Sequence, residues 1–476
     1  MLPQLLHKLR FAPAVFGLLL LGSCATYNQQ VSGYYQHYRQ GDYARASAAL
    51  DDSKLLKKRR NHLLYLLEKG RMEHLLHHYE ASNRYFNEAD NLMEDGRNTI
   101  GDVALSTLLN PMMETYQGED FEKYMVHYYK ALNYLMLNQP AEALVEARRI
   151  SLRAYAQDDV KGKNKYAEDA FSFMLQGLIY EKNRDINNAF IAYRNAADLY
   201  IEHGGSYYGV AMPEQLKKDL LRSADRLGFV DQVQAYERKL GYSLKPEDRV
   251  AGAELVLFWE NGTAPVKEEE NLTFAIVNDG GNFFFTNSRF NTRIPFDASF
   301  STGNARLTDL SFIRAAIPRY ELQPLLYGSA EVMADSTRFA LEPAQSINDL
   351  AQETLRERRL KDLSKTLSRI AVGKLAELAA APKKKEEGKE ETEKEKKDRN
   401  RQELLATGIK LFNFAKEKAD TRNWQSLPAG IAYTRIPLRA DKQTITVSVR
   451  GRGGERSYTL NVDAASGLSF RNLSTF

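Results

Sequence analysis

The chain has 476 residues, of which 43% are hydrophobic and 27% are charged, so it is long enough to bury the cores of two or three domains. Its formal net charge of +4 is small for this length. A near-neutral balance of many charges gives no electrostatic argument for nucleic-acid binding, and we expect no nucleic-acid partner.

The first 23 residues have the composition of an export signal. Lys8 and Arg10 form a basic start, and Phe11–Leu21 is an apolar run too short to span a bilayer comfortably as a permanent helix. The run ends in Leu21-Gly22-Ser23-Cys24, and Cys24 is the only cysteine in the chain. This ending resembles the lipobox of bacterial lipoproteins, in which the cysteine is acylated and becomes the first residue of the mature protein. The alternative is an ordinary signal peptide followed by an incidental cysteine.

Acylation of Cys24 predicts a chain that is held at a membrane by lipid rather than by a helix. Acyl chains contribute about 0.8 kcal/mol per buried CH₂ group, so more than one chain gives a durable anchor. Ala25 follows the cysteine, and by analogy with lipoprotein sorting in enterobacteria this residue favours the outer membrane. We therefore expect a periplasm-facing lipoprotein, with exposure at the cell surface left open. A single cysteine also predicts that no intramolecular disulfide forms.

Phe171–Tyr200 carries the clearest structural pattern in the chain. Small residues stand at Gly177 and Ala189, where two helices must approach closely, and Tyr180 and Tyr193 are placed to fill the space beside them. These spacings match the tetratricopeptide repeat, a pair of antiparallel helices.

Weaker copies of this pattern occur on both sides. One helical pair cannot bury its apolar face alone, so neighbouring pairs are expected. We predict an α-solenoid of four to five units over residues 24–245, with helical segments around Tyr43–Leu50, Leu63–Met93, Glu122–Ile150, Phe171–Tyr200 and Leu216–Leu240.

Two stretches interrupt the helical pattern. Thr107–Asp120 contains a proline and a glycine, and His203–Pro213 contains three glycines and a proline. Long loops that carry aromatic residues are candidate contact sites. Tyr116, Tyr207 and Tyr208 are therefore either partner-binding residues or plugs for gaps in the solenoid.

From residue 246 onward the pattern changes to alternation and to β-branched or aromatic runs. We predict an α+β module with antiparallel strands over residues 246–476, whose sheet is completed by strands far apart in the sequence. Its predicted parts are strands within 253–340, a helix over 347–381, a charged spacer over 383–401, a helix over 403–418 and closing strands within 430–462. The spacer has no apolar side chain, so it is a solvated linker or a helix held by Glu–Lys pairs. The whole chain is thus predicted to be mainly α with a smaller β part.

Four further stretches stand out in the mature chain. They are Tyr116–Glu122 running into His127–Tyr134, Tyr208–Pro213, Glu254–Gly262, and Asp420–Trp424 with Leu427 and Pro428. Together they resemble a family of bacterial outer-membrane lipoproteins with N-terminal tetratricopeptide repeats. The resemblance touches both halves of the chain. It implies a class and a location rather than a chemistry, because the family has no settled activity.

Asp420, Arg422 and Trp424 lie between the predicted helix over 403–418 and the closing strands. One interpretation is an internal staple, with the indole buried where the helix meets the sheet. The alternative is an exposed Arg-Trp pair that serves as a hot spot for a protein partner.

No catalytic constellation appears in the sequence. All eight histidines lie at or before His203, and His74, His77 and His78 lack the HExxH arrangement of zinc enzymes. Nucleotide-binding glycine loops and the G-x-S-x-G nucleophile motif are absent. We predict no enzyme, no cofactor and no metal.

These features predict a lipid-anchored scaffold of the cell envelope that binds protein partners through its solenoid, and a more specific version of this prediction is an accessory role in peptidoglycan synthesis or outer-membrane secretion. The alternative is a glycan-binding or hydrolytic envelope protein that uses an aromatic-lined cleft. The candidate partner-binding residues are Tyr116, Phe121, Tyr207, Tyr208, Trp259, Asp420, Arg422 and Trp424.

Overall fold

A computed structural model describes most of the chain. The described residues are 27–95, 111–158, 169–249, 252–296, 301–302, 305–306, 311–380, 393–394, 397–401, 418–439, 442–463 and 467–476. Cys24 and the predicted helix over 403–418, apart from its last residue, lie outside them. Within these ranges no helix has the length and apolar character needed to cross a membrane.

The first half of the described chain folds into helical pairs. The pairs are α3 (Tyr27–Arg39) with α4 (Tyr43–Asp52), α5 (His62–Leu75) with α6 (Tyr79–Asp95), α8 (Asp120–Met136) with α9 (Pro140–Asp158), α10 (Ala170–Lys182) with α11 (Ile186–Glu202), and α12 (Glu214–Arg226) with α13 (Val230–Leu240). Short 3₁₀ turns lie at Arg59–Asn61, Pro111–Met113 and Pro246–Asp248. The helical segments predicted from the sequence lie within these pairs, and the segment Tyr43–Leu50 covers α4 alone.

Each pair is joined by the same local turn. The second residue after the first helix has a left-handed backbone, at Gly41, His77, Asn138, Arg184 and Gly228. The N–H of the next residue donates to the carbonyl five positions earlier, at 2.7–3.0 Å in all five turns. This bond is the 6→1 contact of the Schellman helix ending, so the pairs are structurally equivalent units. Successive left-handed residues are between 36 positions apart (Gly41 to His77) and 61 positions apart (His77 to Asn138), so no fixed repeat length appears in the sequence.

Close packing within the α10–α11 pair agrees with the predicted register. Ala189 is fully buried, and a Cβ atom built on Gly177 would lie 2.4 Å from the Tyr193 ring. The α5–α6 pair repeats this arrangement, since a Cβ on Gly70 would lie 2.7 Å from the Phe86 ring. The first helix therefore needs glycine where the aromatic residue of the second helix crosses it.

Gly177→Ala is expected to lower the free energy of unfolding by about 1–3 kcal/mol, because the added methyl group overpacks the Tyr193 ring. Gly33→Ala is the matched control, since Gly33 lies inside α3 and a Cβ there meets nothing within 4 Å. The control should gain about 0.5–1 kcal/mol from helix propensity. Urea unfolding of both variants measures the difference, and equal values would contradict the packing.

The second half begins with strands. They are β3 (Ala253–Asn261), β4 (Val266–Asp279), β5 (Asn282–Asn287), β6 (Thr292–Phe296), β7 (Ser301–Thr302), β8 (Ala305–Arg306), β9 (Phe312–Glu321), β10 (Ser329–Ala334), β11 (Thr337–Ala340) and β12 (Glu342–Ser346), and after the helix α14 (Ile347–Ala380) β13 (Gly430–Leu438), β14 (Lys442–Gly451), β15 (Gly454–Asp463) and β16 (Leu468–Thr475). A further hairpin, β1 (Ser206–Tyr207) with β2 (Val210–Ala211), lies between α11 and α12.

Three four-stranded sheets result. The central sheet has the order β12-β13-β3-β16, the second sheet β11-β10-β14-β15 and the arm sheet β6-β5-β4-β9. The prediction that distant strands complete one sheet is confirmed, because β3 pairs with β13 and β16. The antiparallel expectation holds for most pairs, but β16 was not predicted and runs parallel to β3.

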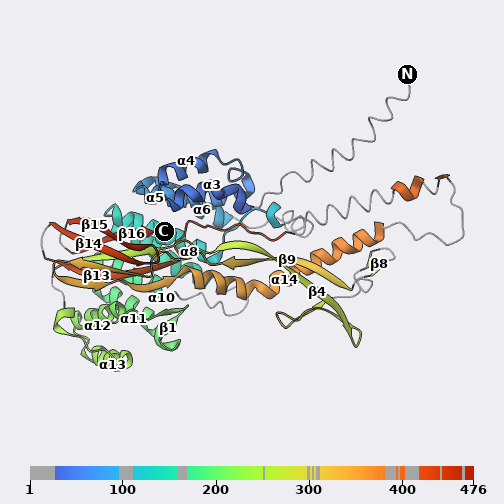
Figure 1. Ribbon diagram of the computed structural model, residues 1–476. Coiled ribbons are helices and arrows are strands. Elements are labelled where there is room, and N and C mark those ends of the chain that lie inside the picture. Colours follow the sequence, from blue (N-terminus) through green and yellow to red (C-terminus); the bar gives the residue numbers. More distant parts are fainter. Residues whose placement is uncertain are drawn as a thin grey trace, which may run out of the picture.

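The central sheet lies between two layers (Figure 1). Leu255, Leu257 and Trp259 on one face of β3 form a core with the second sheet. Val256 and Phe258 on the other face join the core of the helical pairs. In Figure 1 the pairs run from the blue helices above the sheet to the green helices below it.

The inner side of the helical pairs is closed in the described chain, because the central sheet covers it. Phe258 packs against the rings of Tyr128 in α8 and Phe171 in α10, with ring centroids 6.3 Å apart in both cases. Tyr38 of α3 packs on Phe476 at the C-terminus, at 4.6 Å. This side of the helical pairs is therefore not an open surface.

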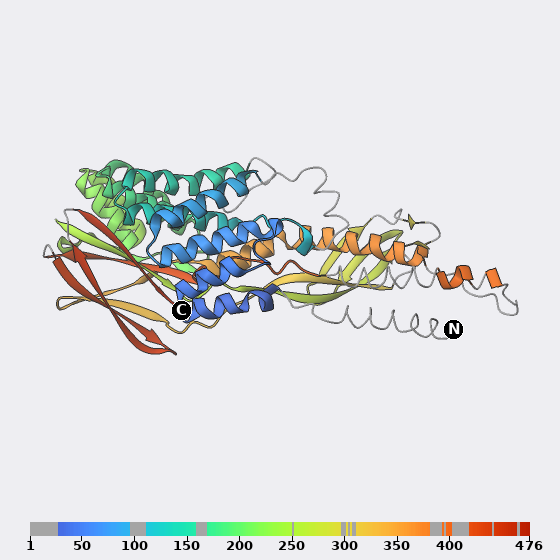
Figure 2. The ribbon, with the colours of Figure 1, turned by 90° about the horizontal axis from the view of Figure 1, so that it is seen from above.

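α14 and the arm sheet extend away from the other layers (Figure 2). Their core joins Phe274, Phe285 and Ile313 of the sheet to Leu363 and Leu367 of the helix. In the predicted charged spacer, the described residues 393–394 and 397–401 are helical and largely exposed.

Candidate functional site

The structure divides the candidate residues into a buried group and an accessible one. Trp424 and Arg422 are 0% and 1% exposed, and Tyr116, Phe121 and Tyr207 are also buried. Asp420 is partly exposed beside Arg422. Trp259 lies inside the core between the central and second sheets, where its indole N–H donates to Thr475 at 2.8 Å. Tyr208 is half-buried and lines a cleft.

Trp424 joins the helical pairs to the strands. Its ring lies 5.7 Å from Phe86 of α6 and 5.9 Å from Tyr129 of α8. Its backbone N–H donates to Glu122 of α8 at 2.7 Å, and its indole N–H donates to Ser426 at 2.9 Å. The indole is thus packed inside the molecule against the helical pairs, while the helix over 403–418 of the staple interpretation lies outside the described residues.

Arg422 fixes the same segment from its other side. Its guanidinium pairs with Asp420 at 2.6 Å and donates to the side chain of Asn61 at 2.9 Å. It also donates to the backbone carbonyls of Arg60, Pro111 and Glu114, and it lies 5.3 Å from the Tyr116 ring. With this many acceptors, the buried guanidinium holds several chain segments together and has a structural role.

A second charged group closes the junction. Glu119, at the start of α8, pairs with Lys267 of β4 and with Arg358 of α14, the latter at 2.9 Å. Burial alone would raise the pKa of Glu119, but the charges of Lys267 and Arg358 hold it at about 2. Glu119 is therefore ionised at neutral pH, and it ties α8 to the arm.

The accessible candidate, Tyr208, opens on a cleft of about 520 Å³ that we call the α14 cleft. Its lining comes from the β1–β2 turn, one side of α14, β9 and the turn before β6. Its lining residues include Tyr208, Gly209, Phe290, Ile317, Pro318, Asp349, Gln352, Leu355, Arg356, Arg359, Leu363 and Thr366. The volume is in the usual range for a binding site.

Tyr208 has an unusual backbone for its residue type. It forms a two-residue hairpin turn with Gly209, and both residues have positive φ, +43° and +73°. Such turns strongly prefer Asn or Gly at the first position, because a left-handed backbone costs other residues about 1–2 kcal/mol. The same turn packs tightly on α14, since a Cβ on Gly209 would collide with the carboxylate of Asp349.

The cleft combines apolar walls with charged edges. Ile317, Pro318, Leu355 and Leu363 supply apolar surface. Arg359 stacks on the Phe290 ring at 3.6 Å and has no ion pair within the described part of the chain. An apolar trough with a stacked guanidinium at its edge can hold an apolar side chain and a neighbouring acceptor group.

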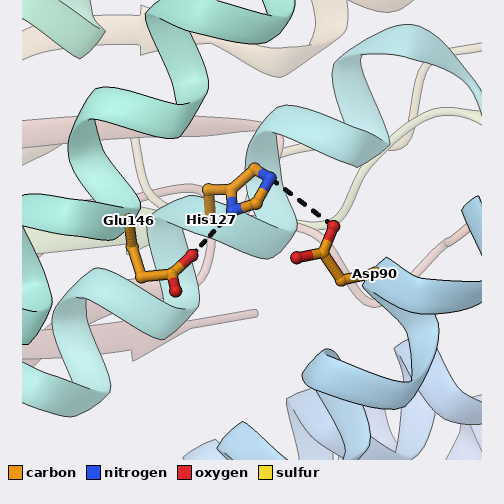
Figure 3. A group of neighbouring side chains, drawn as sticks. All are labelled: Asp90, His127 and Glu146. Atoms are coloured by element: carbon orange, nitrogen blue, oxygen red, sulfur yellow. Dashed lines mark hydrogen bonds and ion pairs between the residues drawn. The ribbon is translucent and has the colours of Figure 1, made fainter. Parts of the chain in front are cut away.

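One buried cluster resembles a metal site. Figure 3 shows His127 of α8 between Asp90 of α6 and Glu146 of α9, 3.7 Å from the first carboxylate and 2.8 Å from the second. Lys130 contacts both carboxylates at 3.3 and 3.0 Å, and Arg149 contacts Asp90 at 3.1 Å. Two cations already balance the two carboxylates, so we interpret the cluster as an ionic link between helices. The sequence did not reveal this cluster, because Asp90, His127 and Glu146 lie on three different helices and form no local motif.

The histidines singled out in the sequence do not form a site. His74 is buried and bonds Asn133 at 2.6 Å and Asn472 at 2.8 Å. Burial, with the nearby charge of Arg71, lowers the pKa of His74 to about 4. His77 contacts Tyr79 and His78 contacts Glu73, both at the surface.

Comparison with known proteins adds little beyond these observations. No protein-family model matches the chain, and no curated protein sequence matches it. Among solved structures it is similar to the apo form of RapI, with 13% identity and a TM-score of 0.33 over 48% of this chain and 56% of RapI. It is also similar to a Podosopora anserina putative kinesin light chain with nearly identical TPR-like repeats, with 12% identity and a TM-score of 0.29 over 45% of this chain and 96% of the other. The chain thus spans little more than half the length of RapI, and the description of the helical pairs rests on their own geometry.

Proposed function

We propose that this chain is a lipid-anchored scaffold of the cell envelope that holds a segment of a protein partner in the α14 cleft. Two facts support the α14 cleft as the binding site. The central sheet covers the inner side of the helical pairs, and Trp259 and Trp424 are buried. Of the candidate aromatic residues, Tyr208 is the one that lines this cleft.

The observation that carries the proposal is the backbone of Tyr208. A strained residue persists where the surrounding structure fixes it, and such residues cluster at binding and active sites. Here the strain places an aromatic ring at the mouth of a cleft, in a turn that Asn or Gly would form at lower cost.

The shape of the cleft indicates what it binds. Its lining extends along α14 from Asp349 to Thr366, about 25 Å at the rise of an α-helix. An extended segment of about seven or eight residues has the same length. The apolar walls favour a segment with an apolar side chain near its middle.

The location in the envelope rests on the sequence. The basic start, the apolar run and the lone Cys24 support acylation and outer-membrane anchoring. A scaffold at this place fits an accessory role in peptidoglycan synthesis or in outer-membrane secretion. The glycan-binding or hydrolytic alternative needs a cleft lined by aromatic residues, and the burial of Trp259 removes one candidate for that lining.

Tyr208→Asn tests the proposal, because asparagine suits the turn but removes the ring. We expect the free energy of unfolding to stay within about 1 kcal/mol of the parent value or to rise, since the left-handed strain is relieved. Partner binding should be lost. A photo-cross-linking amino acid at Gln352, an exposed residue of the cleft, should form adducts with one envelope protein in living cells, and Tyr208→Asn should abolish them.

Two controls complete the experiment. The same cross-linker at Val230, which is 62% exposed on α13, should give no such adduct. Cys24→Ala should release the chain from membranes. Adducts at Gln352 that persist in Tyr208→Asn would contradict the role of the cleft, and continued membrane attachment of Cys24→Ala would contradict the anchor.

A further inference from the structure

A second cleft, which we call the polar cleft, lies at the start of α11, whereas Tyr208 follows the end of that helix, and it has a volume of about 680 Å³. The turn between α10 and α11, the end of α12 and the chain before β3 and β16 enclose it. Its charged lining consists of Glu181, Lys182, Arg184, Arg222, Asp225, Arg226, Arg249 and Glu254. Five of these side chains are basic and three are acidic.

Each acidic side chain of the lining is paired with an arginine. Glu254 accepts from Arg222 at 3.0 Å, Glu181 from Arg226 at 3.3 Å, and Asp225 from Arg249 at 2.8 Å. Behind them, Arg435 pairs with Asp219 at 3.0 Å and also with Glu181 and Glu254, so four arginines meet four carboxylates in this group. Within the described residues, Lys182 and Arg184 therefore remain as two cations with no ion pair.

Both unpaired cations occupy energetically unfavourable positions in the folded chain. Lys182 is partly buried, and burial lowers its pKa, so the folded structure disfavours its charged form. Arg184 has a left-handed backbone, φ +62°, at the turn position where Gly41, Asn138 and Gly228 stand in three other pairs. An arginine there carries a strain that glycine or asparagine would avoid.

We infer that the polar cleft binds a phosphate-bearing ligand between Lys182 and Arg184. A guanidinium and an ammonium group together match the geometry and charge of a phosphate group. The cleft is much larger than a phosphate group, so we expect the ligand to have an additional polar moiety. This inference goes beyond the proposed scaffold function and uses none of its residues.

Titration calorimetry on the purified chain provides the test, with glycerol 3-phosphate as a soluble probe and with phosphatidylglycerol vesicles as a membrane probe. Binding of the soluble probe is expected. Arg184→Asn should weaken it at least tenfold, and Lys182→Gln should act in the same direction, because each removes one charge-assisted contact. Binding of the vesicles alone, with the same loss in both variants, would identify a lipid headgroup as the source of the phosphate.

His77→Asn is the matched control. It makes the same replacement at the equivalent left-handed turn of the α5–α6 pair, outside the polar cleft. It should leave binding unchanged, and Arg184→Asn should melt no lower than the parent because asparagine tolerates this backbone. If neither probe binds, or if Arg184→Asn and His77→Asn bind equally well, the inference is overturned.

Discussion

Replacing Arg71 with methionine is expected to lower the free energy of unfolding by about 3–5 kcal/mol. Arg71 of α5 and Glu260 of β3 are both completely buried, and their ion pair is 2.7 Å long. Arg71 also donates to Ser426 and Ser474 and lies 4.6 Å from the Tyr129 ring. Its removal leaves the Glu260 carboxylate, which still accepts from Ser474 at 2.6 Å, without a balancing charge inside the core that joins the helices to the central sheet.

The loss should depend on pH. Burial alone would raise the pKa of Glu260, but the Arg71 guanidinium holds it below its ordinary value of 4.5. In the parent chain the pair therefore stabilises the fold above this value, and the contribution is lost as the pH falls. Without Arg71, burial raises the pKa of Glu260, and the residue binds a proton on folding. The Arg71→Met defect should thus be smaller at pH 5 than at pH 8.

A double variant separates the ion pair from the packing. Arg71→Met with Glu260→Gln removes both charges and should recover much of the loss, because no buried charge remains uncompensated. Urea unfolding at the two pH values measures all three chains. A single variant that loses less than about 1 kcal/mol, or that is equally damaged at both pH values, would show that water or another cation reaches Glu260.

The sequence predicted those parts of the fold that depend on local pattern. The close approach at Gly177 could be anticipated because a small residue and an aromatic residue repeat at helical spacing within one pair. The strands β3, β5 and β13 could be anticipated from alternation and turn residues. These features need only neighbouring residues to be recognised.

What could not be predicted depends on contacts between distant segments. Arg71 and Glu260 are 189 positions apart, and nothing near either residue signals the other. β16 pairs parallel with β3 and contacts α8 and α10, so it is part of the sheet that covers the helices. Because this strand was not predicted, that cover was not predicted either. The strain at Tyr208 and Arg184 was also invisible, because both residues occupy backbone positions where sequence rules expect glycine or asparagine.

Trp424→Ala is expected to have a comparable effect, a loss of about 3–5 kcal/mol, because it empties the largest fully buried side chain of the junction. The cavity would lie between Phe86, Tyr129 and the segment that leads into β13. Trp424→Phe keeps a ring there and should lose clearly less, with the indole bond to Ser426 removed.

The position of Trp424 adds a second expectation about cooperativity. Its contacts hold the helical pairs and the strands in one core, so their loss should let the two halves unfold in separate transitions. Trp259 and Trp424 are the only tryptophans, and in a Trp259→Phe background the fluorescence reports the junction alone. In that background the indole signal and far-ultraviolet circular dichroism should follow the same urea transition. The two signals of Trp424→Ala in the otherwise unchanged chain, where Trp259 reports the strand core, should diverge. Coincident transitions with an unchanged midpoint in Trp424→Ala would mean that the buried ion pairs alone hold the helices on the central sheet.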